Sequence, residues 1–135
     1  MVSIQHIDVD SLLSQNLVEP WLINIVDNEG FILGDLTIVL GTDEWLLEYN
    51  KSYLDHDYFT DIITFDYVEN NVISGDLLIS IERVGANANS LNVSRETELK
   101  RVVIHGVLHL CGYNDKSPSD VEIMRKKEDF YLNLL

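Results

Sequence analysis

Two of the chain's four histidines, His105 and His109, lie four residues apart in the segment HGVLHLCGYND, which ends at Asp115. On a helix, side chains at i and i+4 project from one face with Cβ atoms about 5–6 Å apart, so both imidazoles could bind one metal ion. Gly112 is placed to end such a helix in a left-handed turn, after which the chain can return the Asp115 carboxylate to the ion. Two imidazoles, one carboxylate and an open position for water are typical of a catalytic zinc site.

Other interpretations of this segment stay open at the level of sequence. Two histidines at helical spacing can be partly buried polar residues, and Asp115 could cap the next helix or hydrogen-bond a ligand instead of binding metal. Residue 106 is Gly, so the segment lacks the glutamate base that zinc proteases of the H-E-x-x-H type need. Cys111 should point away from the face that carries the histidines, and we expect a small buried hydrophobic residue there rather than a ligand.

The elements next to the histidines can be predicted from caps and turns. Ser94 is expected to cap a long helix that ends at about Leu110, and Ser117-Pro118 to open a last helix. Two strands, TDIITFDYV and VISGDLLIS, should form a hairpin because the turn sequence ENN separates them. A further helix from about Ile81 to Leu91 is expected between the second strand and the metal helix.

The first half of the chain should supply the rest of a small sheet and its covering helices. We expect a strand at Val2–Ile7, a helix around Trp21–Glu29 and a strand over Leu33–Gly41. A helix capped by Thr42 follows, and it should turn four side chains inward: Trp45, Leu46, Tyr49 and Tyr53. Together these elements predict a single α+β domain over residues 1–135, with a mixed sheet of about four strands packed against several helices and the metal site on the long helix and the turn after it.

Composition restricts the environment and the partners of the chain. It has 135 residues, of which 46% are hydrophobic, so it is long enough to bury a core. No segment approaches the length of a membrane span, and one cysteine excludes an internal disulfide, so we expect a cytoplasmic protein. The net charge of −14 should repel polyanions, which argues against a broad nucleic-acid-binding face.

The segment HGVLHLCGYND resembles the H-G-x-L-H-L-x-G-Y-D-H motif of the YbeY family, bacterial zinc-dependent endoribonucleases that mature ribosomal RNA. The segments YNKSYLDHDYFTDIITFDY, SGDLLIS and SRETELKRVVIHG are also similar to the family, so the resemblance runs from about Tyr49 to the C-terminus. It implies a Zn²⁺ ion bound by His105, His109 and Asp115. It also implies single-strand-specific cleavage of precursor ribosomal RNA at the small-subunit 3′ end and a part in ribosome quality control. The implied partners are the small ribosomal subunit and an assembly GTPase or a ribosomal protein.

The chain departs from the family pattern at several positions. Asp115 stands where the third family ligand is a histidine, and Asn114 replaces the usual aspartate. Leu54 stands where many members have an arginine, with Lys51 and His56 as the nearest cationic residues. Two carboxylates of the matched strands, Asp61 and Asp76, are candidates for the general base and could equally be turn or strand-end residues.

Binding of RNA by such an acidic chain requires a local concentration of basic side chains. Arg125, Lys126 and Lys127 cluster on the last helix and are our candidates for nucleic-acid contacts, and four further basic residues flank the metal helix: Arg83, Arg95, Lys100 and Arg101. Acidic residues are interspersed among them, so a solvated face of mixed charge is the competing interpretation. Two further functions therefore stay open: a non-catalytic ribosome-assembly factor with a structural metal, and a metal-dependent hydrolase of another substrate.

Overall fold

The computed structural model describes residues 1–7, 9, 13–55 and 58–134. The elements follow in the order β1 (Val2–His6), α1 (Gln15–Asn28), β2 (Ile32–Gly41), α2 (Asp43–Tyr53), β3 (Ile62–Asp66), β4 (Val72–Ser80), α3 (Ile81–Leu91), α4 (Arg95–Leu110) and α5 (Pro118–Leu132). The predicted α+β class is confirmed.

The sheet is mixed, as expected, with the strand order β1-β2-β4-β3. Strands β1, β2 and β4 run parallel, and β3 pairs antiparallel with β4. The predicted hairpin turn is present, because Asn70 and Asn71 both adopt positive φ angles, of 51° and 65°. Asparagine tolerates this left-handed conformation, and two such residues form the turn that suits the twist of a hairpin.

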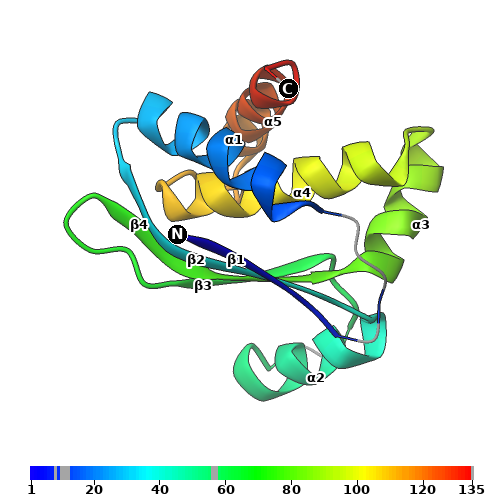
Figure 1. Cartoon of the computed structure of the whole chain (residues 1–135). Coiled ribbons are helices and arrows are strands. Elements are labelled where there is room, and N and C mark those ends of the chain that lie inside the picture. The colour runs from blue at the N-terminus through cyan, green and yellow to red at the C-terminus, as the bar shows by residue number, and fades with distance from the viewer. Residues whose placement is uncertain (8, 10–12, 56–57, 135) are drawn as a thin grey trace.

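The helices divide between the two faces of the sheet, with α1, α3, α4 and α5 on one side and α2 on the other (Figure 1). The larger hydrophobic core lies under α1 and α4, and a smaller cluster around Leu46, Ile63 and Leu78 lies on the α2 side. Helix α4 approaches the sheet closely at Gly106, where a Cβ atom would stand 2.8 Å from side-chain atoms of Ile62 and Leu77. The absence of a side chain at Gly106 therefore allows the helix that carries both histidines to pack closely against β3 and β4.

The predicted helix starts are confirmed at three places. The side-chain oxygens of Thr42, Ser94 and Ser117 each accept a hydrogen bond from the backbone N–H three residues later. These caps fix where α2, α4 and α5 begin. No helix of the described chain is long and apolar enough to cross a bilayer.

Two expectations about the first half need correction. Helix α1 begins at Gln15 rather than near Trp21, and it contains Pro20, which has no N–H to donate to the carbonyl of Asn16 one turn earlier. Tyr53 does not point inward: it is 65% exposed and stacks on Tyr49 with ring centroids 5.7 Å apart. The reason is that the fully buried stripe of α2 follows Leu46 and Asn50, one residue further round the helix than Tyr49 and Tyr53.

Candidate metal centre

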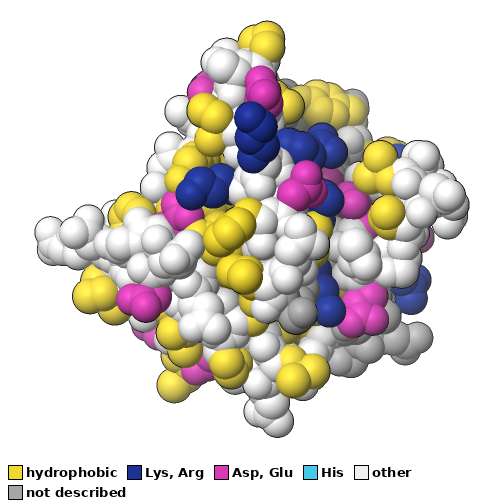
Figure 2. Space-filling model, turned by 90° about the horizontal axis from the view of Figure 1, so that it is seen from above, with side chains coloured by type: hydrophobic (Ala, Val, Ile, Leu, Met, Phe, Trp, Pro, Cys, Tyr) yellow, Lys and Arg dark blue, Asp and Glu magenta, His cyan; other side chains and the backbone are white. Residues whose placement is uncertain are grey.

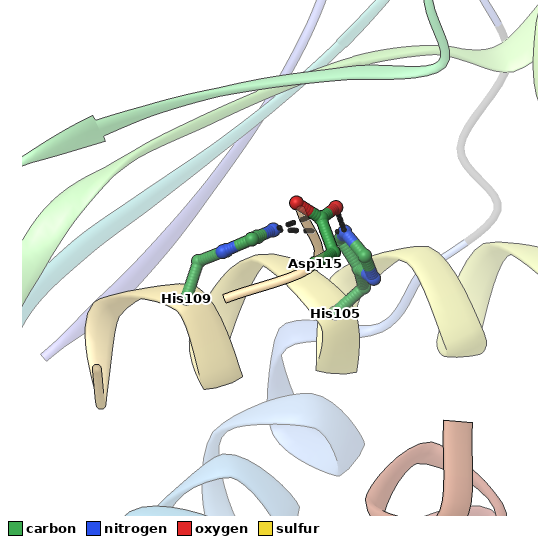
Figure 3. Close-up of side chains that lie close together, drawn as sticks. All are labelled: His105, His109 and Asp115. Carbon is green, nitrogen blue, oxygen red and sulfur yellow. Dashed lines mark hydrogen bonds and ion pairs between the residues drawn. The ribbon is translucent and has the colours of Figure 1, made fainter. Parts of the chain in front are cut away.

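The end of α4 brings the third candidate ligand back over the helix. Gly112 has a φ of 104°, its N–H donates to the carbonyl of His109, and the N–H of Tyr113 donates to the carbonyl of Leu108. This pair of bonds is a Schellman motif, which ends the helix and reverses the chain. As a result, the carboxylate of Asp115 lies between the two imidazoles, which project from one side of α4 (Figure 3).

The three candidate ligand atoms form a nearly equilateral triangle. The Nε2 atoms of His105 and His109 are 3.0 Å apart, and the Asp115 Oδ2 atom lies 3.2 Å from the first and 3.3 Å from the second (Figure 3). A tetrahedral zinc site with bonds of about 2.0–2.1 Å has ligand-to-ligand distances of about 3.3 Å. The spacing of the donor atoms therefore fits a zinc ion with little rearrangement, and the described residues supply three protein ligands to it.

The proton positions on the two imidazoles also favour a cation. The Nδ1–H of His109 donates to the Tyr113 carbonyl, 2.9 Å away, because a carbonyl oxygen can only accept. His105 directs its Nδ1 at the Glu128 carboxylate, 2.7 Å away, and donates to it in the same way. When both rings are neutral, each turns an unprotonated Nε2 toward the Asp115 carboxylate. Three acceptors that converge in this way repel one another unless a cation lies between them.

Glu128 was not predicted as a site residue from the sequence, where it is one of the acidic residues interspersed among the basic ones. Its side chain is only 5% exposed, and Arg101 donates to it over 3.0 Å and to Asp129 over 2.7 Å. Burial would lower the pKa of His105, but the hydrogen bond and charge of Glu128, with the charges of Asp115 and Asp61, raise that pKa above its ordinary value. The sequence did carry a signal that Glu128 is buried, because Met124, Glu128 and Tyr131 recur at helical spacing and form the buried face of α5.

Asp115 and Cys111 both lie close to the end of α4, and caps and burial decide between the roles open to each. The cap of α5 is Ser117 and not Asp115, so the interpretation of Asp115 as a helix cap is wrong. Cys111 is half-buried and packs against the core, and it is not part of the group that could bind metal. Burial raises the pKa of its thiol to about 12, so the thiolate that a metal needs is disfavoured.

An open cleft of about 490 Å³ borders the centre, and His105 and Asp115 line it together with residues of β3, α3, α4 and α5. Asp61, one of the two candidate bases, also lines this cleft, and burial raises its pKa more than the positive charge of His105 lowers it. Asp76, the other candidate, accepts a hydrogen bond from Tyr67 in a groove that Trp45 also lines, on the α2 side of the sheet. The structure therefore brings Asp61, and not Asp76, to the metal centre.

The three basic candidates on α5 do not form one patch, because consecutive helix residues point in different directions. Arg125 lines the cleft, and within the described ranges it makes no ion pair. Lys126 pairs with Glu122 over 3.2 Å, and Lys127 reaches Glu29 of α1 over 3.1 Å. Most of the basic residues that flank the metal helix are paired as well, each with an acid: Arg83 with Asp43, Lys100 with Glu96, and Arg101 with Glu128 and Asp129.

The charge pattern of the surface agrees with these pairs. Figure 2 shows lysine and arginine side chains beside acidic and hydrophobic ones rather than in an uninterrupted basic face.

Leu54, which stands where the resemblance placed a family arginine, caps the C-terminus of α2 and is 44% exposed. It is not among the residues that line the cleft. His56, one of the nearby cationic residues, lies outside the described residues. Arg125 is thus the cleft arginine without an acidic partner in the part of the chain that the structure describes.

Comparisons with known proteins extend over nearly the whole chain. A family model described as endoribonuclease YbeY matches residues 3–135. A protein named endoribonuclease YbeY from Parabacteroides distasonis is 46% identical over 91% of this chain and 87% of its own length. One from Flavobacterium johnsoniae is also 46% identical, over 96% of this chain and 93% of its own. The solution structure of TM1509 from Thermotoga maritima superposes with a TM-score of 0.72 at 31% identity, covering 98% of this chain and 87% of that one.

Proposed function

Because the chain belongs to the endoribonuclease YbeY family, we propose that it is a zinc-dependent endoribonuclease acting on single-stranded precursor ribosomal RNA at the small-subunit 3′ end. The observation that carries the proposal is the convergence of two imidazole Nε2 atoms and one carboxylate oxygen, 3.0–3.3 Å apart, beside an open cleft. Bound there, a zinc ion would stabilise negative charge on a phosphate and make water a better nucleophile.

The openness of the centre supports a catalytic rather than a structural metal. Structural zinc sites have four protein ligands and are closed, whereas catalytic sites leave a position for water or substrate. Here the side chains of His105, His109 and Asp115 remain 25%, 27% and 43% exposed. The carboxylate in place of a third imidazole reduces the net charge of a zinc site from +2 to +1, so we expect a weaker Lewis acid than in relatives with three histidines.

Three residues of the chain have proposed roles around the reacting phosphate. Asp61 accepts the proton that water loses as it attacks phosphorus and the P–O bond to the leaving ribose oxygen breaks. Burial raises the pKa of this carboxyl and makes it a stronger base. Arg125 holds a phosphate of the bound strand, because this guanidinium lies in the cleft without an acidic partner among the described residues. Glu128 keeps His105 in the tautomer that presents Nε2 to the metal.

The charge of the cleft supports metal-dependent binding of RNA. Four carboxylates line it, those of Asp61, Glu98, Asp115 and Glu128, against two guanidinium groups, those of Arg101 and Arg125. A divalent cation would offset the excess of negative charge, so RNA should bind the metal-loaded protein better. With so few free cations, we propose that a partner in the cytoplasm supplies the remaining affinity: the small ribosomal subunit with an assembly GTPase or a ribosomal protein.

The test is cleavage of a single-stranded RNA that carries the precursor sequence of the small-subunit 3′ end. Zinc-reconstituted protein should cleave it, while chelated protein and the His105→Ala/His109→Ala variant should not. Asp61→Asn should retain zinc but cleave about 10²–10⁴-fold more slowly. The matched control Asp76→Asn should keep both zinc and activity. Undiminished cleavage by the double histidine variant would refute the proposal.

A further inference from the structure

An unsatisfied carboxyl oxygen lies in the cleft beyond the metal centre. Glu98 of α4 is only 5% exposed, it lines the cleft, and its Oε1 atom is buried without a hydrogen-bond partner in the described structure. A buried acceptor without a donor is costly, and such groups in native proteins call for a functional or structural explanation. Its neighbour Glu96, by contrast, is exposed and pairs with Lys100 at 3.0 Å.

The surroundings of Glu98 resemble a site for a flat, partly polar molecule. Apolar side chains of Val102, Met124 and Leu91 line the same cleft as Glu98, and Asn87 and Ser90 of α3 add an amide and a hydroxyl. Apolar walls with a few convergent polar groups are typical of small-molecule sites. The volume of about 490 Å³ lies within the usual range of such sites.

The distance from the metal centre matches the length of one nucleotide. Glu98 precedes His105 by seven residues on the same face of α4, which is about 10 Å along the helix axis. A nucleotide with its phosphate at the metal centre extends over a comparable distance to the far edge of its base. The orphan carboxyl oxygen is therefore placed where the base of a bound nucleotide would present its hydrogen-bonding edge.

We infer that this part of the cleft is a nucleobase subsite, in which the Glu98 carboxyl accepts a hydrogen bond from the exocyclic amino group of adenine, cytosine or guanine. The inference rests on the proposed function, because it takes the bound phosphate to lie at the metal centre. Uracil has no amino group, and its N3–H donor lies between two carbonyl oxygens that repel an ionised carboxylate. The subsite therefore discriminates against uridine next to the scissile bond.

The charged groups around Glu98 act on its protonation state in opposite directions. Burial, followed by the charges of Asp61 and Glu128, raises the pKa of Glu98, while Arg101 and Arg125 act in the opposite direction. An ionised carboxylate only accepts, whereas a neutral carboxyl would also donate its O–H to a uracil carbonyl, so the discrimination requires the ionised form. Arg101 is already bonded to Glu128 and Asp129, so it does not satisfy the orphan oxygen.

The experiment uses the four nucleoside 5′-monophosphates, which contain no phosphodiester bond to cleave. Each is titrated into zinc-loaded protein and followed by amide NMR shifts. The expected result is that the adenosine, cytidine and guanosine monophosphates bind about 5-fold more tightly than uridine monophosphate. The largest shifts should fall at Asn87, Ser90 and Val102.

Two variants and one control make the test specific. Glu98→Ala should remove the discrimination against uridine monophosphate, and Glu98→Gln should do the same while preserving the shape of the side chain, because an amide can also donate to uracil. Glu96→Ala should leave the discrimination unchanged. Equal affinity of the wild type for all four nucleotides, or discrimination that survives in both Glu98 variants, would overturn the subsite. Cleavage of RNA by the same wild-type protein would then show that the proposed function stands without it.

Discussion

At the scale of single residues, Glu128 shows how a side chain that is not a candidate ligand can orient one that is. Its buried carboxylate accepts from Nδ1 of His105 and is itself held by Arg101. A carboxylate in this position fixes the imidazole tautomer and makes Nε2 a stronger ligand. The arrangement links a residue of α5 to a candidate metal ligand of α4.

Replacement of Glu128 by Gln should therefore weaken zinc binding by about 10–100-fold. The matched control is Asp129→Asn, since Asp129 also accepts from Arg101 but does not touch His105. Competition with a chromogenic chelator measures both affinities. Equal affinities of Glu128→Gln and wild type would show that the hydrogen bond to His105 does not support metal binding.

The candidate ligands could be predicted from the sequence because the information is local. His105, His109 and the Gly112 turn are separated by a few residues, and helix geometry alone places their side chains. Glu128 lies 23 residues from His105, and their contact depends on how α5 packs against α4. Local periodicity could place Glu128 on the buried face of α5 but could not show that this face meets His105. Periodicity likewise could not show that Asp61 lies in the cleft and Asp76 on the other side of the sheet.

At the scale of elements, the turn after α4 is the part that completes the centre. Gly112 adopts a φ of 104°, and apart from its chain neighbours no atom of the described residues lies within 4 Å of the position that a Cβ would occupy. Replacement by Ala would thus meet no clash, and its cost comes from the left-handed backbone alone. That backbone directs the following residues, including Asp115, back toward the histidines.

Gly112→Ala should lower the free energy of unfolding by about 1–2 kcal/mol and also weaken zinc binding. Gly30→Ala is a matched control, because Gly30 follows α1 with a φ of 86° and equally open surroundings. It should cost a similar amount of stability without changing zinc affinity. Urea unfolding and chelator competition on both variants separate the two effects, and equal zinc affinities would contradict the role of the turn.

A second feature at this scale is the connection of α1, the turn and α5 through Glu29. Its carboxylate, 6% exposed, accepts from Tyr113 at 2.6 Å, from Lys127 at 3.1 Å and from Tyr131. Burial alone would raise the pKa of Glu29, but these hydrogen bonds lower it below its usual value. The folded state therefore binds the Glu29 proton less readily than the unfolded chain does.

The contribution of Glu29 to stability should be complete at pH values above its unfolded pKa and should be lost as the pH falls through the lowered folded pKa. Glu29→Gln should cost about 1–3 kcal/mol at pH 7. The difference from wild type should shrink in urea unfolding experiments as the pH is lowered to about 3. Asp27→Asn, an exposed neighbour on α1, should show neither effect; a difference for Glu29→Gln that is independent of pH would contradict the assignment.

At the scale of the whole molecule, the acidic surface and the proposed RNA substrate are compatible only if few phosphates are bound. Among the described residues of the cleft, Arg125 is the arginine without an acidic partner, whereas Lys126 and Lys127 are paired with glutamates. Composition gives the net charge, but it does not show which lysine and arginine side chains form ion pairs and which do not. That distinction depends on which side chains the packed helices bring together.

Binding of single-stranded RNA by the zinc-loaded protein should consequently show a shallow salt dependence. Arg125→Ala should lower the slope of log affinity against log salt by about 0.7, the value for one phosphate contact on a single strand. Lys126→Ala should leave the slope unchanged. Fluorescence anisotropy over a salt series measures both, and a steep slope that neither substitution alters would place the binding face elsewhere on the molecule.

The central claim is that His105, His109 and Asp115 bind one zinc ion, and metal analysis of protein purified without chelator tests it most directly. The prediction is about one zinc per chain in the wild type, none in His105→Ala/His109→Ala, a strong loss in Asp115→Ala and recovery in Asp115→His. Zinc retained at the wild-type level in the double histidine variant, or a wild-type protein that takes up no zinc on titration, would contradict it.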